Sequence, residues 1–238
     1  MRVTFVYGGT AMPPSSPVSD AMVNSEGALA WEDRALERSL AAARDRSSAR
    51  GRRLVNAARA LANESGSSAF TVADVASRAG VSLRSFYRHF SGKDELFLAL
   101  FEEEARLGVG LLTEALSGVS GPFARLQGYV VGLSEFIVRG SGYAVLLVRE
   151  HIRLGSTRPD EMRAALRPLV ELLELELAAA AEAGDIREVD GDDAILVFSL
   201  ILSHVHTAVL FKPEEDPGVG STRLWEFCRS ALTIAQAP

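Results

Sequence analysis

Apolar residues recur three and four positions apart along most of the chain, which is the spacing of one face of an α-helix. No segment shows the alternation of apolar and polar residues that a half-buried strand requires. The sequence therefore predicts an all-α protein, with breaks at glycine and proline. The longer helices are expected over residues 94–116, 121–139, 141–154, 160–183, 190–211 and 221–236.

The N-terminal part divides into three pieces by the same criteria. Residues 1–27 are rich in Gly, Pro and Ser and lack apolar periodicity, so a flexible tail is expected there. An extra amphipathic helix is expected over residues 28–46, with an apolar side made of Leu29, Leu36, Leu40 and Ala43. A second helix begins near Ser48, and its apolar side holds Leu54, Ala57, Ala58, Leu61 and Ala62.

Three short segments then carry helix-end signals. Thr71 with Asp74 has the spacing of a capping box, and Gly80 supplies a left-handed stop. Ser82 is placed to cap the next helix, and Ser91 with Asp94 repeats the capping-box spacing. Two helices of about eight residues joined by so short a turn predict a helix-turn-helix.

The second of these helices, expected over Leu83–Phe90, has an inner and an outer side at 100° per residue. The inner side is predicted to hold Leu83, Phe86 and Phe90. The outer side is predicted to hold Arg84, Ser85 and Arg88, flanked by Tyr87 and His89. Such a face suits a DNA major groove, and an ordinary solvated face is the alternative. Thr71 and Lys93 add phosphate-seeking groups at helix N-termini.

The net charge of −6 alone argues against nucleic-acid binding, but the charges are segregated along the chain. Residues 44–93 sum to +7, whereas residues 1–43 sum to −2 and residues 94–238 to −11. A basic module is thus joined to a larger acidic one, and the basic module is suited to phosphate. The single cysteine, Cys228, and the lack of a signal-peptide stretch favour a cytoplasmic protein.

Residues 50–101, and most strongly 71–101, closely resemble the DNA-binding domain of the TetR family of bacterial transcription regulators. The specific features are the Ala76-to-Gly80 turn spacing, the Phe-Tyr-x-His-Phe of Phe86–Phe90, and Lys93 followed by Leu96. The resemblance implies a three-helix DNA-binding domain over residues 47–93 and a helical ligand-binding and dimerisation domain over residues 94–238. The DNA contacts that it implies are Thr71, Ser82, Leu83, Arg84, Ser85, Tyr87, Arg88, His89 and Lys93.

Two departures limit what the resemblance transfers. Leu83 and Arg84 differ from the polar or basic residue and the small residue that many relatives carry, so the base preference cannot be borrowed. The likeness also begins only near Arg50. The basic residues at its edge form either an arm that reaches the minor groove or a solvated surface, and they are Arg44, Arg46, Arg50, Arg52 and Arg53.

The acidic module carries no motif of its own, and its aromatic and polar residues have two readings. They line an apolar site for a small molecule, or they belong to the core and surface. The ligand-binding candidates are Tyr129, Phe136, Tyr143, Arg149, Phe198 and Trp225. Glu150 and His151 are further candidate polar anchors.

Metal-binding and catalytic motifs are not evident in this module. His204 and His206 point about 200° apart on a helix, so they cannot chelate one ion together. Cys228 is expected to be a small apolar core residue. Neither a cofactor nor enzymatic activity is expected, because no Walker loop, HExxH zinc site or GxSxG elbow is found.

Residues 194–211 are apolar nearly all round, which suits a membrane span or a helix buried on every side. Two His, two Ser and one Thr within 18 residues favour the buried helix. The last two helices carry more apolar surface than a monomer hides, which predicts a homodimer through a four-helix bundle. The residues expected there are Leu196, Leu200, Phe211, Leu224, Phe227 and Leu232.

These observations predict a cytoplasmic, dimeric repressor that binds an inverted-repeat operator in double-stranded DNA. A small apolar or amphipathic effector is expected to release it. The alternative is the same DNA-binding module with a C-terminal domain that only dimerises or is controlled by a protein partner. A solid C-terminal core without a cavity would favour that alternative.

Overall fold

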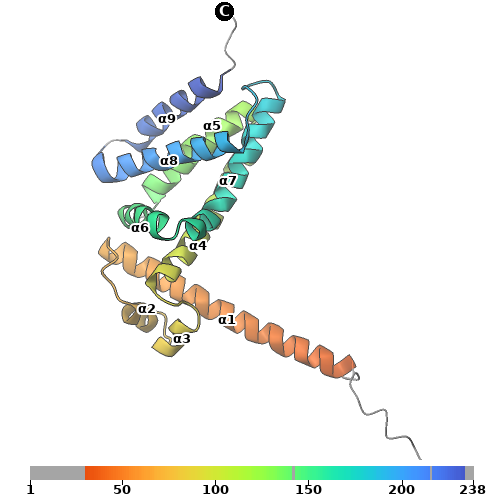
Figure 1. Cartoon of the computed structure of the whole chain (residues 1–238), viewed down its shortest axis with the longest axis vertical. Helices are drawn as coiled ribbons and strands as arrows, with labels where there is room; N and C mark the ends of the chain where they lie inside the picture. Colours follow the sequence, from red (N-terminus) through yellow and green to blue (C-terminus); the bar gives the residue numbers. More distant parts are fainter. Residues whose placement is uncertain (1–29, 141–142, 215, 234–238) are drawn as a thin grey trace, which may run out of the picture. The chain divides into compact units, whose positions relative to one another are not determined.

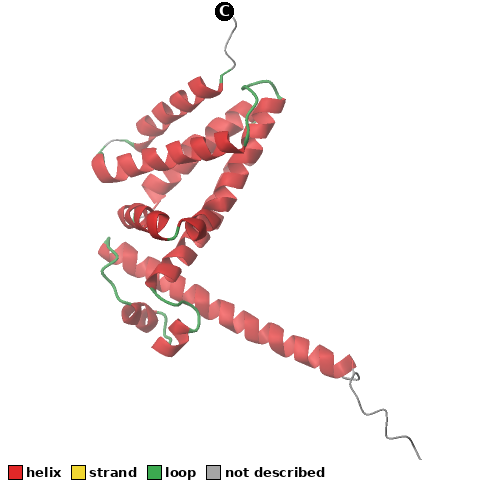
Figure 2. Cartoon of the chain, in the orientation of Figure 1, coloured by secondary structure: helices red, strands yellow, loops and turns green. Residues whose placement is uncertain are grey.

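The computed structural model describes residues 30–140, 143–214 and 216–233, and this part of the chain contains helices and loops but no strand (Figures 1 and 2). The predicted all-α fold is confirmed. The helices are α1 (Ala30–Ser65), α2 (Val72–Arg78), α3 (Leu83–Tyr87), α4 (Lys93–Ser117), α5 (Pro122–Gly140), α6 (Ala144–Thr157), α7 (Pro159–Glu182), α8 (Gly191–Phe211) and α9 (Pro217–Leu232). The predicted tail over residues 1–27 lies outside the described residues.

Helix α1 is continuous where the sequence predicts two helices, so the break expected between residues 46 and 48 was wrong. Ser47 and Ser48 have only a modest helix penalty, and neither fixes a non-helical backbone as proline would. Residues up to Asp45 and residues from Arg46 onward form separate compact units. In the first unit Leu36, Leu40 and Ala43 are exposed, so the described part of the expected apolar side is not buried, and Leu29 lies outside the described residues.

In the second unit, α1 contributes its apolar side to the core as predicted. Leu54, Ala57, Ala58 and Ala62 are buried, and Leu61 packs against them half-buried. The same cluster contains Phe86 of α3 and Phe97 of α4, together with Leu154 of α6. The core of the helix-turn-helix therefore continues into the C-terminal helices.

The predicted end signals of α2 and α3 are confirmed. The Thr71 hydroxyl accepts from the Asp74 N–H, and the Asp74 carboxylate accepts from the Thr71 N–H, which completes the capping box. Gly80 has a φ of +64°, a conformation that glycine adopts without steric cost. The Ser82 hydroxyl accepts from the Ser85 N–H at the start of α3.

The predicted capping box of Ser91 with Asp94 was wrong. Gly92 occupies the cap position of α4 without a side-chain bond. The Ser91 N–H donates instead to Glu95 Oε2 at 2.6 Å. Asp94 is drawn away because its carboxylate accepts from the Arg153 guanidinium of α6, also at 2.6 Å.

A second apolar cluster holds the C-terminal bundle together, built from α4, α5, α7, α8 and α9 (Figure 1). Helices α4 and α5 approach closely because α5 has glycine where α4 has leucine. A Cβ on Gly128 would lie 2.7 Å from Leu116 Cδ2, and one on Gly132 would lie 3.1 Å from Leu112 Cδ2. These two glycines therefore let the helices interlock.

Helix α8 is buried on one side only, which differs from the predicted burial on every side. Its inner side includes Val197, Phe198 and Ile201, whereas Ile195 and Leu196 are exposed. By length and composition alone, α8 is the one single helix among the described residues that is able to cross a bilayer, and core helices of soluble proteins also pass this test. Cys228 is buried in the core, as predicted.

Candidate nucleic-acid interface and internal cavity

The outer surface of α3 presents a mixed polar and apolar face. Leu83 and Tyr87 are 47% and 59% exposed, and Ser82, Arg84 and Arg88 are also exposed. Two guanidinium groups, a phenol and an aliphatic side chain thus point to solvent from one helix. These groups are suited to base edges and phosphates in a major groove.

The buried and exposed sides of α3 differ from the prediction at two residues. Ser85 is only 6% exposed and shares the buried side with Phe86, whereas Leu83, expected inside, is exposed. Helix α3 packs against α2, and a serine is small enough to lie at such a contact. His89 is half-buried, and its Nε2 is buried without a hydrogen-bond partner among the described residues. Leu83, rather than Ser85, is therefore available to a partner.

Thr71 and Lys93 are placed at the N-termini of α2 and α4, as the sequence predicts. Thr71 is exposed, although its hydroxyl serves the capping box. The Lys93 ammonium donates to the carbonyl oxygens of Ser68 and Phe70, and it lies 4.5 Å from the centroid of the Phe70 ring. Burial lowers the pKa of Lys93. Lys93 thus fixes the loop between α1 and α2, with one of its three N–H donors left over.

A cavity of about 240 Å³ lies among six helices of the second unit. Apolar side chains make up most of its wall, from α4, α5, α6, α7 and α8. Helix α1 contributes Arg59 and Asn63, so the helix that precedes the helix-turn-helix forms part of the wall. The alternative of a solid C-terminal core is therefore not what the structure contains.

Half of the ligand-binding candidates line this cavity. Phe136, Tyr143 and Phe198 do so, whereas Tyr129 and Trp225 are in the core. The Tyr129 hydroxyl donates to the Leu169 carbonyl at 2.6 Å, and the Trp225 ring packs on Phe123.

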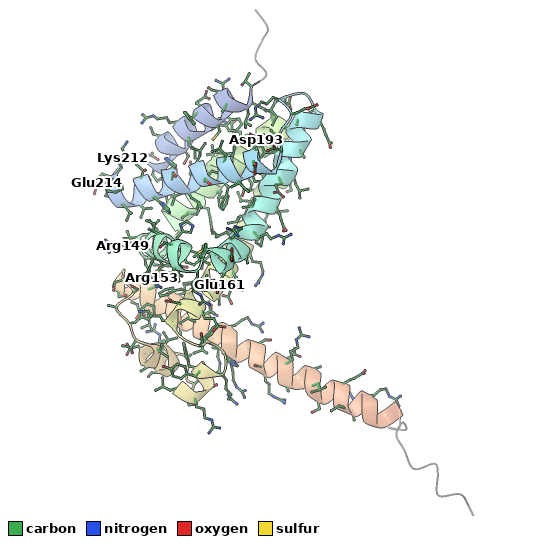
Figure 3. All side chains as sticks on the ribbon, viewed as in Figure 1. Arg149, Arg153, Glu161, Asp193, Lys212 and Glu214 are labelled. Atoms are coloured by element: carbon green, nitrogen blue, oxygen red, sulfur yellow. The ribbon has the colours of Figure 1, made fainter. Side chains whose placement is uncertain are left out.

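Only one of the three candidate polar anchors on α6 lines the cavity. Arg149 is exposed on the outside of α6 (Figure 3). Glu150 is buried, but it accepts from Arg153 at 2.8 Å and does not line the cavity. His151 does line it. On one helix, only every third or fourth residue faces the same side, so consecutive candidates cannot all share the cavity.

Arg59, Glu104 and Tyr143 form a polar cluster in the cavity wall. Arg59 Nε donates to Glu104 Oε1 at 2.8 Å, and the Tyr143 hydroxyl donates to the same oxygen at 2.6 Å. Burial by itself lowers the pKa of Arg59, but the hydrogen bond and charge of Glu104 outweigh it and raise that pKa. Burial, followed by the contact with Glu104, raises the pKa of Tyr143. At neutral pH the cluster is an ion pair with a protonated phenol.

His151 of α6 and His206 of α8 form a second polar group of the wall. His151 Nδ1 lies 3.2 Å from His206 Nε2, a hydrogen-bond distance in which one ring donates and the other accepts. Burial, and then the neighbouring His206, lower the pKa of His151 to about 4. Burial also lowers the pKa of His206. Both rings are therefore neutral at pH 7.

The two histidines of α8 are apart, as the helical spacing predicts. His206 faces the cavity, whereas His204 packs against Gly220 of α9. No group of three His, Cys, Asp or Glu side chains able to hold a metal ion occurs within the described ranges. The pair of His151 and His206 was missed because the residues are 55 positions apart, and no sequence pattern links them.

The lowered pKa of His151 predicts that the free energy of unfolding depends on pH. A pKa lowered from about 6.5 in the unfolded chain to about 4 in the fold means that the folded state disfavours the proton. The free energy of unfolding should therefore fall as pH drops below 6.5, and His151 alone should account for about 2 kcal/mol between pH 7 and pH 5. Urea unfolding at both pH values, on the wild type and on His151→Leu, measures the difference. An equal pH dependence in both proteins would contradict the assignment.

Comparison with known proteins finds a family model that matches the helix-turn-helix part of the chain. The model for bacterial regulatory proteins of the tetR family matches residues 54–100, which covers the helix-turn-helix and the start of α4. A search of curated proteins gives no significant sequence match.

Solved structures match over most of the chain. The regulator RolR, in complex with its ligand resorcinol, is 18% identical, covers 80% of this chain and 91% of its own, and has a TM-score of 0.63. FadR from Bacillus subtilis, in complex with stearoyl-CoA, is 19% identical, covers 76% of this chain and 98% of its own, and has a TM-score of 0.64. FadR from Thermus thermophilus, a TetR-family repressor in complex with lauroyl-CoA, is 19% identical, covers 79% of this chain and 97% of its own, and has a TM-score of 0.65. The family model therefore matches the helix-turn-helix part of this chain, and the solved structures share its helical fold.

Proposed function

We propose that the protein is a dimeric repressor that binds an inverted-repeat operator and is released when a small molecule occupies the cavity. The observation that carries this proposal is the cavity itself, whose wall includes Arg59 and Asn63 of α1 as well as the C-terminal helices. RolR and the two FadR proteins, which share the fold, are described with small-molecule ligands. A bound molecule here would touch the DNA-binding module directly.

The release depends on a difference in affinity between two arrangements of the protein. Helix α4 runs from Lys93, beside the helix-turn-helix, past Glu104 in the cavity wall to Ser117. A ligand that fits best when α4 has shifted draws the protein into the arrangement that does not bind DNA. A ligand with equal affinity for both arrangements shifts nothing.

Exposed apolar residues on α8 and α9 support the homodimer. Leu196, Phe211 and Phe227, all expected in the interface, are exposed, and Phe211 reaches 77%. Leu200 is half-buried, whereas Leu224 and Leu232 are buried in the core of their own subunit. A two-fold pairing through these helices would present two α3 helices to half-sites about 34 to 36 Å apart, or a multiple of that distance.

The second candidate function is a regulator whose C-terminal domain only dimerises or answers to a protein partner. The cavity counts against it, because a domain that only dimerises has no need for such a space. We assign the protein to DNA binding rather than catalysis and to the bacterial cytoplasm, where the chromosome is accessible.

Selection of duplexes from a random pool by the full-length protein tests the DNA-binding half of the proposal. We expect an enriched inverted repeat. The Arg84→Ala variant should lose base preference at one position per half-site, at a cost of about 1 to 3 kcal/mol. Arg149→Ala, on the outside of α6, is the matched control and should select the same repeat as the wild type. Enrichment of no sequence, or unchanged selection by Arg84→Ala, would contradict the assignment.

A further inference from the structure

The cavity wall has no net charge. Arg59 is the one arginine or lysine among its lining residues, and Glu104 is the one carboxylate. The two are hydrogen-bonded at 2.8 Å, and Arg59 also donates to Glu103 at 3.2 Å. An anionic ligand would have to compete with carboxylates for Arg59, and a cationic ligand would have to compete with Arg59 for Glu104. A charged group would therefore lose its hydration without gaining an uncompensated partner.

The histidine pair provides hydrogen-bonding groups of both kinds. A neutral imidazole has one donor and one acceptor nitrogen. One nitrogen of each ring is used in the contact between His151 Nδ1 and His206 Nε2. If His151 donates in that contact, its outer nitrogen is an acceptor and the outer nitrogen of His206 is a donor; if His206 donates, these roles are exchanged. In either case the pair offers one donor and one acceptor.

A hydroxyl group can bond to either outer nitrogen, because it both donates and accepts. It therefore gains a hydrogen bond in either arrangement of the pair. A carboxylate and an ammonium group can each bond to only one of the two nitrogens, and each also loses its hydration in a wall without net charge. The pair and the neutral wall together favour an uncharged hydroxyl.

The size of the cavity sets the third requirement. A cavity of about 150 Å³ lined by apolar residues is enough for benzene. The space here is about 240 Å³, with Phe101, Phe136 and Leu169 in its wall. It therefore suits one ring with a short substituent, and it does not hold a nucleotide-sized, highly charged carrier group.

We infer that the effector is a compact, uncharged molecule with an apolar body of about one ring and a hydroxyl group bound at the His151 and His206 pair. This inference rests on the proposed function, because it names the ligand class of the same cavity. It differs from a carboxylate or an acyl-CoA in both charge and size.

Four matched probes test the ligand class on the full-length protein at pH 7.5. They share a propylbenzene body and are 4-propylphenol, 4-propylbenzoate, 4-propylbenzylamine and propylbenzene itself. Calorimetry should show that the phenol binds at least tenfold more tightly than each of the others. In His206→Leu the advantage of the phenol over propylbenzene should disappear while propylbenzene still binds, and Arg149→Ala should retain it.

Three results would overturn the inference. They are tighter binding of the benzoate or the amine than of the phenol, equal binding of the phenol and propylbenzene, and no binding of any probe. Displacement of the selected duplex is measured in parallel. A phenol that binds with the expected preference but leaves DNA affinity unchanged would refute release by ligand and keep the ligand class. A benzoate that binds best and releases DNA would refute the ligand class and keep release by ligand.

Discussion

The affinity of the protein for its operator is expected to fall by a factor of roughly 10³ to 10⁵ when salt is raised from about 50 to 200 mM. This is the effect of releasing counterions from about six to ten phosphates contacted by a dimer. The physical reason is the charge distribution, since residues 44–93 carry +7 while the chain as a whole carries −6. Fluorescence anisotropy with the selected duplex at several salt concentrations measures the slope, and a flat response would exclude extensive phosphate contact.

The same titration separates the two readings of the N-terminal arginines. Arg52 and Arg53 are exposed in the unit that contains the helix-turn-helix, and Arg44 is exposed in the unit that precedes it. Replacing Arg44 and Arg46 by alanine should reduce the salt slope if they reach the duplex. An unchanged slope would identify them as solvated surface.

Phe86→Ala is expected to lower the free energy of unfolding by about 3 to 5 kcal/mol, and with it to abolish specific DNA binding. Phe86 is completely buried, and its ring lies 5.4 Å from that of Tyr87 and 5.7 Å from that of Phe90. Alanine at this position would leave a cavity beneath α3, so the helix would lose the contact that orients its exposed face.

Leu83→Ala, on the same helix, is the matched control for stability. Leu83 is about half exposed, and a surface substitution of this kind usually changes stability by less than about 0.5 kcal/mol. Urea unfolding followed by circular dichroism measures both variants. Equal destabilisation of the two proteins would show that Phe86 does not anchor the helix.

Local features of the fold were predictable because their causes lie within a few residues. The capping box of Thr71 and Asp74, the left-handed Gly80 and the cap at Ser82 each depend on groups no more than four positions apart. Asp94 shows the limit of this reasoning. Its local spacing indicates a cap, but an arginine 59 positions later binds it instead.

The cavity could be predicted only in part, for the same reason. Aromatic residues at helical spacing indicate that a helix side is buried, but they do not separate a cavity wall from a filled core. Phe136 and Tyr129 are both on α5, yet one lines the cavity and the other is packed in the core. The polar groups that give the cavity its chemistry come from helices far apart in the chain, such as Arg59 of α1 and Glu104 of α4.

The interlocked end of α4 affects how far a displacement at the cavity wall moves the helix-turn-helix. Leu112 and Leu116 fill the spaces above Gly132 and Gly128, and Arg125 donates to the Leu116 carbonyl at 3.3 Å, so we expect this end to resist sliding. A rigid α4 would then move by pivoting about this point. At 1.5 Å per residue, Glu104 is about 18 Å from Leu116 and Lys93 about 35 Å. A displacement at the cavity wall would thus be roughly doubled where α4 meets the helix-turn-helix.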